Sequence, residues 1–356
     1  MRIVYVYADS PAEWNCSEWR CAIPARAINR AGRHQAELVS LADFGTHTPA
    51  ATAACERADV IVVQRNLAGP VLSAIQHWKA RGKVLLADFD DAYDLMPPSN
   101  PAYAYWIRGL VHGPGKDAPV VKVNPPPLTQ FKWGLRLVDA ATVPSKRLAS
   151  DWQAYTDVRY LPNYIELSNY QNIKPAPHQD ILVGWGGSLS HLQSFTESHV
   201  MKALQRVCRA RPQVKALVCG SDRRIFDDLP LPAGQKILQP WVPYSEWPQV
   251  LSRFDIGIAP LYGPYDERRS WIKVLEYMVM KIPWAASDGP AYSDLRPFGW
   301  LVSNTAGAWE RLLLDMVDHL DEYRQNTVQD AYLYALAQSV DENVEKIVET
   351  YASIAT

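Results

Sequence analysis

The chain has 356 residues, of which 48% are hydrophobic and 21% are charged, so it can bury the cores of two domains and is not disordered. Its formal charge of −2 provides no overall electrostatic attraction to nucleic acid. The sequence has no run of about 18 apolar residues, the length needed to span a membrane as a helix. The five cysteines are scattered, which predicts reduced thiols in a cytoplasmic protein rather than disulfides or a zinc site.

The first half of the chain alternates short apolar strands with helices. This spacing is typical of βαβ units, so residues 1–165 are predicted to form a Rossmann-like domain with a parallel sheet. Pro24 should kink or break the first helix. Strands are expected at 3–7, 36–41, 59–64, 83–87, 140–143 and 158–161, and helices at 17–31, 70–81, 128–138 and 145–154.

An acidic turn follows the fourth of these strands. It contains Asp88, Asp90 and Asp91, and loops at the carboxyl ends of parallel strands often carry function. We therefore predict Asp90 and Asp91 as catalytic carboxylates and Asp88 as an acceptor contact. A solvated acidic turn or a metal-free N-cap is the alternative.

Residues 92–127 are rich in Pro, Gly and aromatic side chains. The segment is too long for a simple connection and is predicted to be a lid or an acceptor-binding insertion. Tyr105 and Trp106 are its candidate acceptor contacts. Residues 166–180 are expected to form a linker between the domains.

The second half begins with a strand, a glycine pair and a serine-rich helix start. Here backbone N–H groups can approach phosphate oxygens closely, which predicts donor contacts at Gly187 and Ser188 with His191 nearby. A surface position on a helix is the alternative for His191. The helix is expected to continue to residue 210, within a second Rossmann-like domain at 181–335.

A predicted helix at 269–280 follows a strand at 255–261 and a polar loop. Arg269, Lys273 and Glu276 fall within roughly 60° of one another on its surface. Two cations near a helix start oppose the helix dipole, and a bound anion would resolve that conflict. Pyrophosphate on Arg269 and Lys273, with ribose hydroxyls on Glu276, fits this pattern. An exposed helix face with paired charges remains the alternative.

At this point the sequence resembles a known family. The pattern Asp-x-Gly-x-Ala-Pro at 255–260 is followed by Arg269-Ser270-x-x-Lys273-x-x-Glu276-Tyr277 and then by Pro283 and Ser287-Asp288. This is similar to the nucleotide-sugar site of GT-B retaining glycosyltransferases of the family 4 type, including bacteriophage forms. The resemblance implies a ribose contact at Glu276, a diphosphate contact at Lys273 and a donor site that includes Ser270.

Further expectations rest on the same resemblance. They include two Rossmann-like domains facing across a cleft, a C-terminal helix at 336–356 that crosses back to the first domain, and a nucleobase contact at Val242. In the first half, Ser17-x-x-Arg20-x-x-x-Pro24 resembles the family's N-terminal domain, with Arg20 on the acceptor side. The family's sugar-contacting Glu is replaced by Arg268 in this chain.

The implied activity is transfer of a hexose from a UDP- or GDP-sugar to an acceptor hydroxyl with retention of configuration. Neither a cofactor nor a metal is expected, because Lys273 and its neighbours would stabilise the leaving diphosphate. If the enzyme instead inverts, Asp90 or Asp91 is the candidate base.

Several alternatives stay open on the sequence alone. The acceptor is a saccharide or lipid-linked glycan, or else a hydroxymethylated base in phage DNA. A nucleotide-sugar-binding or epimerase-like protein without transfer is a third alternative. The protein is expected in the cytoplasm of a bacterium or of a phage-infected host. Peripheral association with a membrane is compatible with each of these alternatives.

Overall fold

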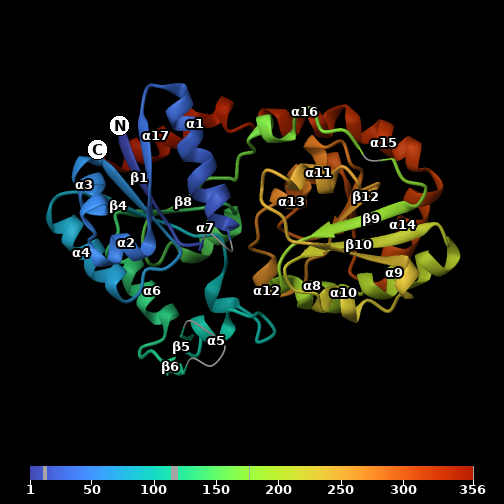
Figure 1. Cartoon of the computed structure of the whole chain (residues 1–356), viewed down its shortest axis with the longest axis horizontal. Helices are drawn as coiled ribbons and strands as arrows, with labels where there is room; N and C mark the ends of the chain where they lie inside the picture. The colour runs from blue at the N-terminus through green and yellow to red at the C-terminus, as the bar shows by residue number, and fades with distance from the viewer. Residues whose placement is uncertain (11–13, 114–118, 176, 356) are drawn as a thin grey trace.

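The computed structural model describes residues 1–10, 14–113, 119–175 and 177–355. Two parallel six-stranded sheets lie side by side, each covered by helices (Figure 1). Apolar clusters fill both faces of each sheet, as expected for buried parallel strands. The predicted pair of Rossmann-like domains is confirmed. Residues 114–118 of the predicted insertion and residue 176 of the predicted linker lie outside the described residues.

The first sheet has the strand order β2-β1-β3-β4-β7-β8. The order reverses between β1 and β3, and doubly wound sheets bind ligands beyond the carboxyl ends of the strands at such a point. The strands are β1 (Arg2–Tyr7), β2 (Gln35–Ser40), β3 (Val60–Gln64), β4 (Val84–Asp88), β7 (Ala140–Val143) and β8 (Val158–Tyr160).

The first helical segment changes character at Pro24. A π-helical turn, η2 (Glu18–Ala22), leads into α1, and Pro24 lies in the first turn of α1, where its missing N–H breaks no helical hydrogen bond. The backbone stays helical through Pro24, so this region changes from π-helical to α-helical geometry and does not break. The helices of this domain are α1 (Ile23–Ala31), α2 (Leu41–Thr46), α3 (Pro49–Arg57), α4 (Pro70–Ala80), α6 (Pro127–Leu135) and α7 (Lys146–Trp152).

The segment predicted as an insertion extends from the first domain at the lower edge of Figure 1. Its first part packs into the domain core, and an antiparallel hairpin follows. Its elements are η3 (Tyr93–Leu95), α5 (Tyr103–Trp106), β5 (Leu110–His112) and β6 (Val120–Lys122).

The second sheet has the strand order β11-β10-β9-β12-β13-β14, which reverses between β9 and β12. Of the candidate donor residues, Gly187 and Ser188 follow β9, and Lys273 contacts the end of β9. The strands are β9 (Ile181–Gly186), β10 (Val214–Gly220), β11 (Lys236–Pro240), β12 (Ile256–Ala259), β13 (Trp284–Ser287) and β14 (Trp300–Val302).

Three expectations for the second domain were wrong in detail. The long helix to residue 210 is divided into η5, α8 and α9, and the left-handed conformation of His199, with φ of 63°, separates α8 from α9. The predicted polar loop contains α12, and the helix expected from 269 begins only at Ile272, as α13. The helices include η5 (Leu189–His191), α8 (Leu192–Glu197), α9 (Val200–Ala210), α10 (Arg224–Asp228), α11 (Trp247–Leu251), α12 (Gly263–Asp266), α13 (Ile272–Val279), η7 (Ser293–Phe298) and α14 (Ala306–Asp318).

Two chain segments cross between the domains side by side. The Ile165 N–H donates to the Gln338 carbonyl at 2.9 Å, and the Val340 N–H donates to the Ile165 carbonyl at 2.8 Å. The second crossing leads into α17, which packs on the first domain (Figure 1). The predicted return of the C-terminal helix is confirmed. The remaining elements are η4 (Leu167–Tyr170), η6 (Ala233–Gln235), α15 (Leu320–Val328), α16 (Asp330–Ala337), η8 (Asp341–Asn343) and α17 (Val344–Ala355).

Within the described part of the chain, no helix combines the length and apolar character needed to cross a bilayer.

We expect Ile347→Ala to lower the free energy of unfolding by about 2–5 kcal/mol. Ile347 lies on α17 and is only 1% exposed, because its side chain packs against the first domain. Chemical denaturation of the full chain measures this change. Glu349→Ala, exposed on the same helix, should change stability by about 0.5 kcal/mol or less. Equal stability of the two variants would show that α17 does not pack on the first domain.

Candidate active site

The first turn of α13 lies against the loop that follows β9. Lys273 Nζ donates a hydrogen bond to the Gly186 carbonyl and lies 5.2 Å from the centre of the Trp185 ring. A Cβ at Gly187 would lie 3.2 Å from Nζ and 2.7 Å from the Trp185 ring, so only glycine lets the loop approach so closely. Burial lowers the pKa of Lys273 to about 8. The loop and the lysine together form a site suited to an anion.

Glu276 lies about one helical turn further along α13. It is 7% exposed, and one oxygen accepts a 2.7 Å hydrogen bond from the Tyr170 hydroxyl. Burial raises the pKa of Glu276 to about 7. The alternative of an exposed helix face is therefore excluded for Glu276. The Trp247 side chain also hydrogen-bonds to the carboxylate, whose remaining lone pairs can accept from ligand hydroxyls.

Arg269 precedes α13 and spans the space between the domains. Its side chain is 14% exposed, and Nε donates to Asp266 Oδ1 at 2.7 Å. Nη2 donates to Ser190 Oγ at 3.0 Å. Nη1 lies 3.9 Å from Asp91 Oδ1 of the first domain. A permanently charged group is thus held between the loop after β9 and the acidic turn after β4.

The loop after β9 carries the next two predicted donor residues. Ser188 Oγ accepts from the Ser190 N–H at the start of η5. His191 is buried, which lowers its pKa well below the ordinary value, so the ring is neutral at pH 7. The surface alternative for His191 does not hold.

Val242 and Ser270 lie at the edges of this arrangement. Val242 follows β11 and packs, partly buried, against the apolar cluster that includes the inner face of α13. Ser270 Oγ accepts a 3.1 Å hydrogen bond from Asn163 Nδ2, at the end of the first domain. Ser270 therefore joins the domains beside the site.

Asp90 and Asp91 have different environments in the first domain. Burial alone would raise the pKa of Asp90, but Arg65, with Nη2 3.6 Å from Oδ2, helps to hold it below the usual value. Burial raises the pKa of Asp91 above its usual value, despite Arg269. The two environments thus move the pKa values of the two carboxylates apart, and the raised pKa favours Asp91 as the proton acceptor of the pair.

Asp88 and Arg20 form a buried ion pair inside the first domain. Arg20 Nε and Nη2 donate to the two Asp88 oxygens at 2.8 and 2.6 Å. Arg20 Nη1 donates to the Leu161 carbonyl at 2.9 Å and to Asn163 Oδ1 at 3.0 Å, while Thr142 Oγ1 donates to Asp88 at 2.6 Å. Because these bonds engage both side chains within the domain, the geometry supports a positioning role for the pair rather than the predicted acceptor contact.

The two predicted aromatic acceptor contacts also differ from each other. Trp106 is buried and stacks on Tyr93 with ring centres 4.0 Å apart, so it belongs to the domain core. Tyr105 is partly buried, and its hydroxyl donates to Asn66 Oδ1 at 3.4 Å, just beyond the carboxyl end of β3. Of the two, only Tyr105 lies where an acceptor could reach it.

The α12 segment of the second domain docks onto the first domain. Tyr265 is 4% exposed and packs in the first-domain core. Arg268 Nε donates to Asp151 Oδ2 at 2.6 Å, and Arg147 pairs with Glu267 at 2.9 Å. The position at which the resemblance implies a sugar-contacting Glu therefore holds the domains together.

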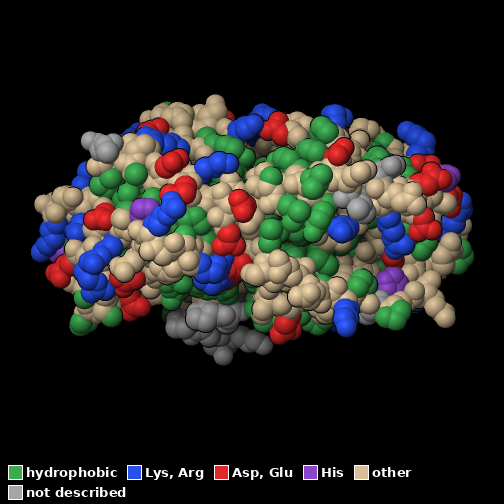
Figure 2. Space-filling view, turned by 90° about the horizontal axis from the view of Figure 1, so that it is seen from above, with side chains coloured by type: hydrophobic (Ala, Val, Ile, Leu, Met, Phe, Trp, Pro, Cys, Tyr) green, Lys and Arg blue, Asp and Glu red, His purple; other side chains and the backbone are tan. Residues whose placement is uncertain are grey.

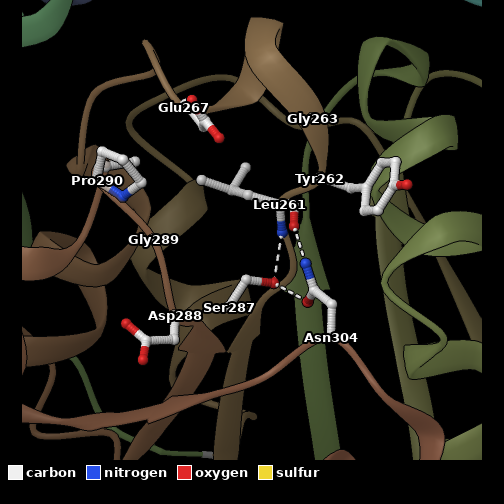
Figure 3. Close-up of a pocket in the computed structure, with 10 residues that line it drawn as sticks. Leu261, Tyr262, Gly263, Glu267, Ser287, Asp288, Gly289, Pro290 and Asn304 are labelled. Carbon is white, nitrogen blue, oxygen red and sulfur yellow. Dashed lines mark hydrogen bonds between the residues drawn. The ribbon is translucent and has the colours of Figure 1, made fainter.

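A small cavity of about 110 Å³ lies beside the start of this segment, at the carboxyl ends of β12 and β13 (Figure 3). Ser287 Oγ accepts from the Leu261 N–H at 2.9 Å and donates to Asn304 Oδ1 at 2.7 Å. Asn304 Nδ2 donates to the Leu261 carbonyl at 2.8 Å. These bonds fix the chain as it leaves β12 and so position α12 and Arg269.

Sequence reasoning missed two residues that orient the candidate donor groups. Asp266 is buried and binds both Arg269 and the Tyr262 N–H, the latter at 2.9 Å. Its place in the loop before Arg269 was the available signal. Tyr170, a partner of Glu276, lies in the predicted linker, where no local pattern points to a site.

No three His, Cys, Asp or Glu side chains in the described ranges are grouped so that they could hold a metal ion.

Sequence comparison finds no matching family model and no matching curated protein. Solved structures do match. HepE from Anabaena, in complex with UDP and glucose, is 14% identical, with a TM-score of 0.68, over 99% of this chain and 100% of its own. A sucrose-phosphate synthase from Thermosynechococcus elongatus is 11% identical, with a TM-score of 0.64, over 99% of this chain and 98% of its own.

The chain has the GT-B fold. A Listeria monocytogenes protein assigned as a UDP-N-acetylglucosamine 2-epimerase matches as well, with 10% identity and a TM-score of 0.59, over 99% of this chain and 96% of its own. The GT-B fold thus accommodates more than one chemistry, and the reaction has to be argued from the site.

We expect the affinity for UDP to fall above about pH 8, by up to about tenfold per pH unit, because Lys273 then loses its charge in the free protein. Calorimetry from about pH 7 to about pH 9.5 measures this fall. Lys273→Arg keeps its charge and should flatten the profile. A parallel decline in both proteins would exclude Lys273 as its cause.

We expect Arg20→Met to lower the free energy of unfolding by about 3–5 kcal/mol, because Asp88 would be left buried without its cation. UDP affinity should be unchanged. Arg33→Met, at a largely exposed arginine, is the control for denaturation. Unchanged stability in Arg20→Met would contradict the positioning role.

Proposed function

We propose that this chain is a glycosyltransferase that moves a hexose from a nucleoside-diphosphate sugar to an acceptor hydroxyl. One observation carries the proposal: Lys273 and Glu276 lie inward on α13, beside the glycine loop at the carboxyl end of β9. The cation and the loop suit a diphosphate, and the buried carboxylate suits the ribose diol. UDP or GDP is the expected nucleotide, and the complex of HepE with UDP supports the former.

In the proposed reaction, the bond between the sugar C1 and the diphosphate oxygen breaks and a bond from C1 to the acceptor oxygen forms. Negative charge develops on the departing diphosphate, where Lys273 and Arg269 stabilise it. The acceptor proton passes to a diphosphate oxygen if configuration is retained, which the family resemblance favours. It passes to Asp91 if configuration is inverted.

A saccharide is the acceptor class that the surface favours. A groove of about 320 Å³ lies between the predicted insertion and α8, and its lining contains two acids and neither Lys nor Arg. On the face seen in Figure 2, cations and anions are interspersed rather than gathered by sign. DNA phosphates would be repelled from such a groove, whereas sugar hydroxyls can donate to its carboxylates. The lining residues are Pro97, Pro98, Ser99, Leu192, Gln193, Thr196, Glu197 and Asp228.

We expect one or more of a panel of UDP- and GDP-sugars to be consumed, by transfer to saccharide acceptors or by slow hydrolysis. Lys273→Ala and Glu276→Ala should each reduce consumption by about a hundredfold or more while leaving the fold intact. Lys202→Ala, at an exposed lysine on α9, is the matched control.

Nuclear magnetic resonance of the products separates the alternatives. Transfer with the donor's anomeric configuration supports the retaining assignment, and an inverted product rules it out. Epimerisation of the sugar without transfer would instead assign the chain to the epimerase class. Normal donor binding in Glu276→Ala would refute the ribose role of that residue.

A further inference from the structure

The three nitrogens of the Arg269 guanidinium have different partners. Nε and Nη2 are fixed by Asp266 and Ser190, which belong to the same domain as Arg269. Nη1 faces Asp91 across the cleft at 3.9 Å, beyond hydrogen-bond distance. Two nitrogens therefore hold the guanidinium in place, while the third has only an electrostatic contact.

The first-domain partner, Asp91, accepts a hydrogen bond from the Tyr265 hydroxyl but none from Arg269. The Asp91 side chain is 26% exposed, and it follows β4 at the mouth of the sheet. Its neighbour Asp90 lies 3.6 Å from Arg65 of its own domain. Asp91 instead faces the cation from the opposite domain, so the charges of the cleft balance only while the two domains are apposed.

The site offers a stronger anion for Arg269. Ser190, which holds Nη2, lies in the loop after β9 that also approaches Lys273. A diphosphate bound in that loop would lie beside the guanidinium and could accept hydrogen bonds from it, whereas Asp91 accepts none from Arg269. A group with several negative charges also attracts Arg269 more strongly than one carboxylate at the same distance.

We propose that Asp91 and the donor diphosphate compete for Arg269, so that donor binding releases the Asp91 carboxylate into the cleft. This inference rests on the proposed function. Once released, Asp91 can accept a hydrogen bond from the acceptor hydroxyl and orient it. Donor binding thus prepares the acceptor side of the cleft and favours binding of the donor first.

Calorimetry with UDP tests the competition without an acceptor. Asp91→Asn removes the competing charge at nearly constant shape and should bind UDP about fivefold more tightly than the unaltered protein. Asp151→Asn breaks another contact between the domains, the 2.6 Å bond from Arg268, without freeing Arg269. UDP affinity in Asp151→Asn should be unchanged, and thermal unfolding confirms that each variant is folded.

A double-mutant cycle separates competition from simple repulsion between Asp91 and the ligand. In an Arg269→Gln background, Asp91→Asn should no longer tighten UDP binding, because the shared cation is gone. Asp91→Ser repeats the cycle if Asp91→Asn does not fold. If Asp91→Asn tightens UDP binding equally in the protein that keeps Arg269 and in the Arg269→Gln background, or does not tighten it in the protein that keeps Arg269, the inference is overturned while the proposed function stands. A complete absence of UDP binding in the unaltered protein would overturn both this inference and the proposed function.

Discussion

The proposed donor site depends on holding a cation and a carboxylate away from water on one helix. Lys273 and Glu276 are close in sequence on α13, and burial shifts the pKa of each toward its neutral form. Such groups are costly to bury unless partners or a ligand compensate them. Tyr170 and Trp247 are partners of Glu276, and the Gly186 carbonyl is the partner of Lys273. A nucleoside diphosphate offers what remains, namely negative charge for Lys273 and hydroxyl donors for Glu276.

The fold brings this helix to the cleft through two features of its topology. The strand order of the second sheet reverses between β9 and β12, so the loop after β9 has open space beside it for Lys273. The two crossing segments pair at Ile165, and the α12 segment docks Tyr265 into the opposite core. These contacts place the acidic turn after β4 within 3.9 Å of Arg269. The charges of both domains thus meet in one cleft.

Much of this arrangement was predictable from local patterns. Alternating apolar strands and helices indicated both sheets, and Pro24 marked the start of α1. The turn that contains Gly187 was recognisable because close approach requires a residue without a side chain. The strand before Asp88 was also identified, but Asp88 was predicted in the turn that follows it. In the structure Asp88 is the last residue of β4, and its carboxylate is buried inside the domain. Only the folded chain brings Arg20 to Asp88, since the partners are far apart in sequence. For the same reason, no local pattern could pair Tyr170 with Glu276 or Arg268 with Asp151.

A crystal structure of the chain with UDP tests the central claim most directly. The account predicts the diphosphate between the loop at Gly187 and the Lys273 amino group, with the ribose hydroxyls on the Glu276 carboxylate. UDP bound elsewhere on the surface, with Lys273 still on the Gly186 carbonyl and Glu276 still contacting only Tyr170 and Trp247, would contradict it.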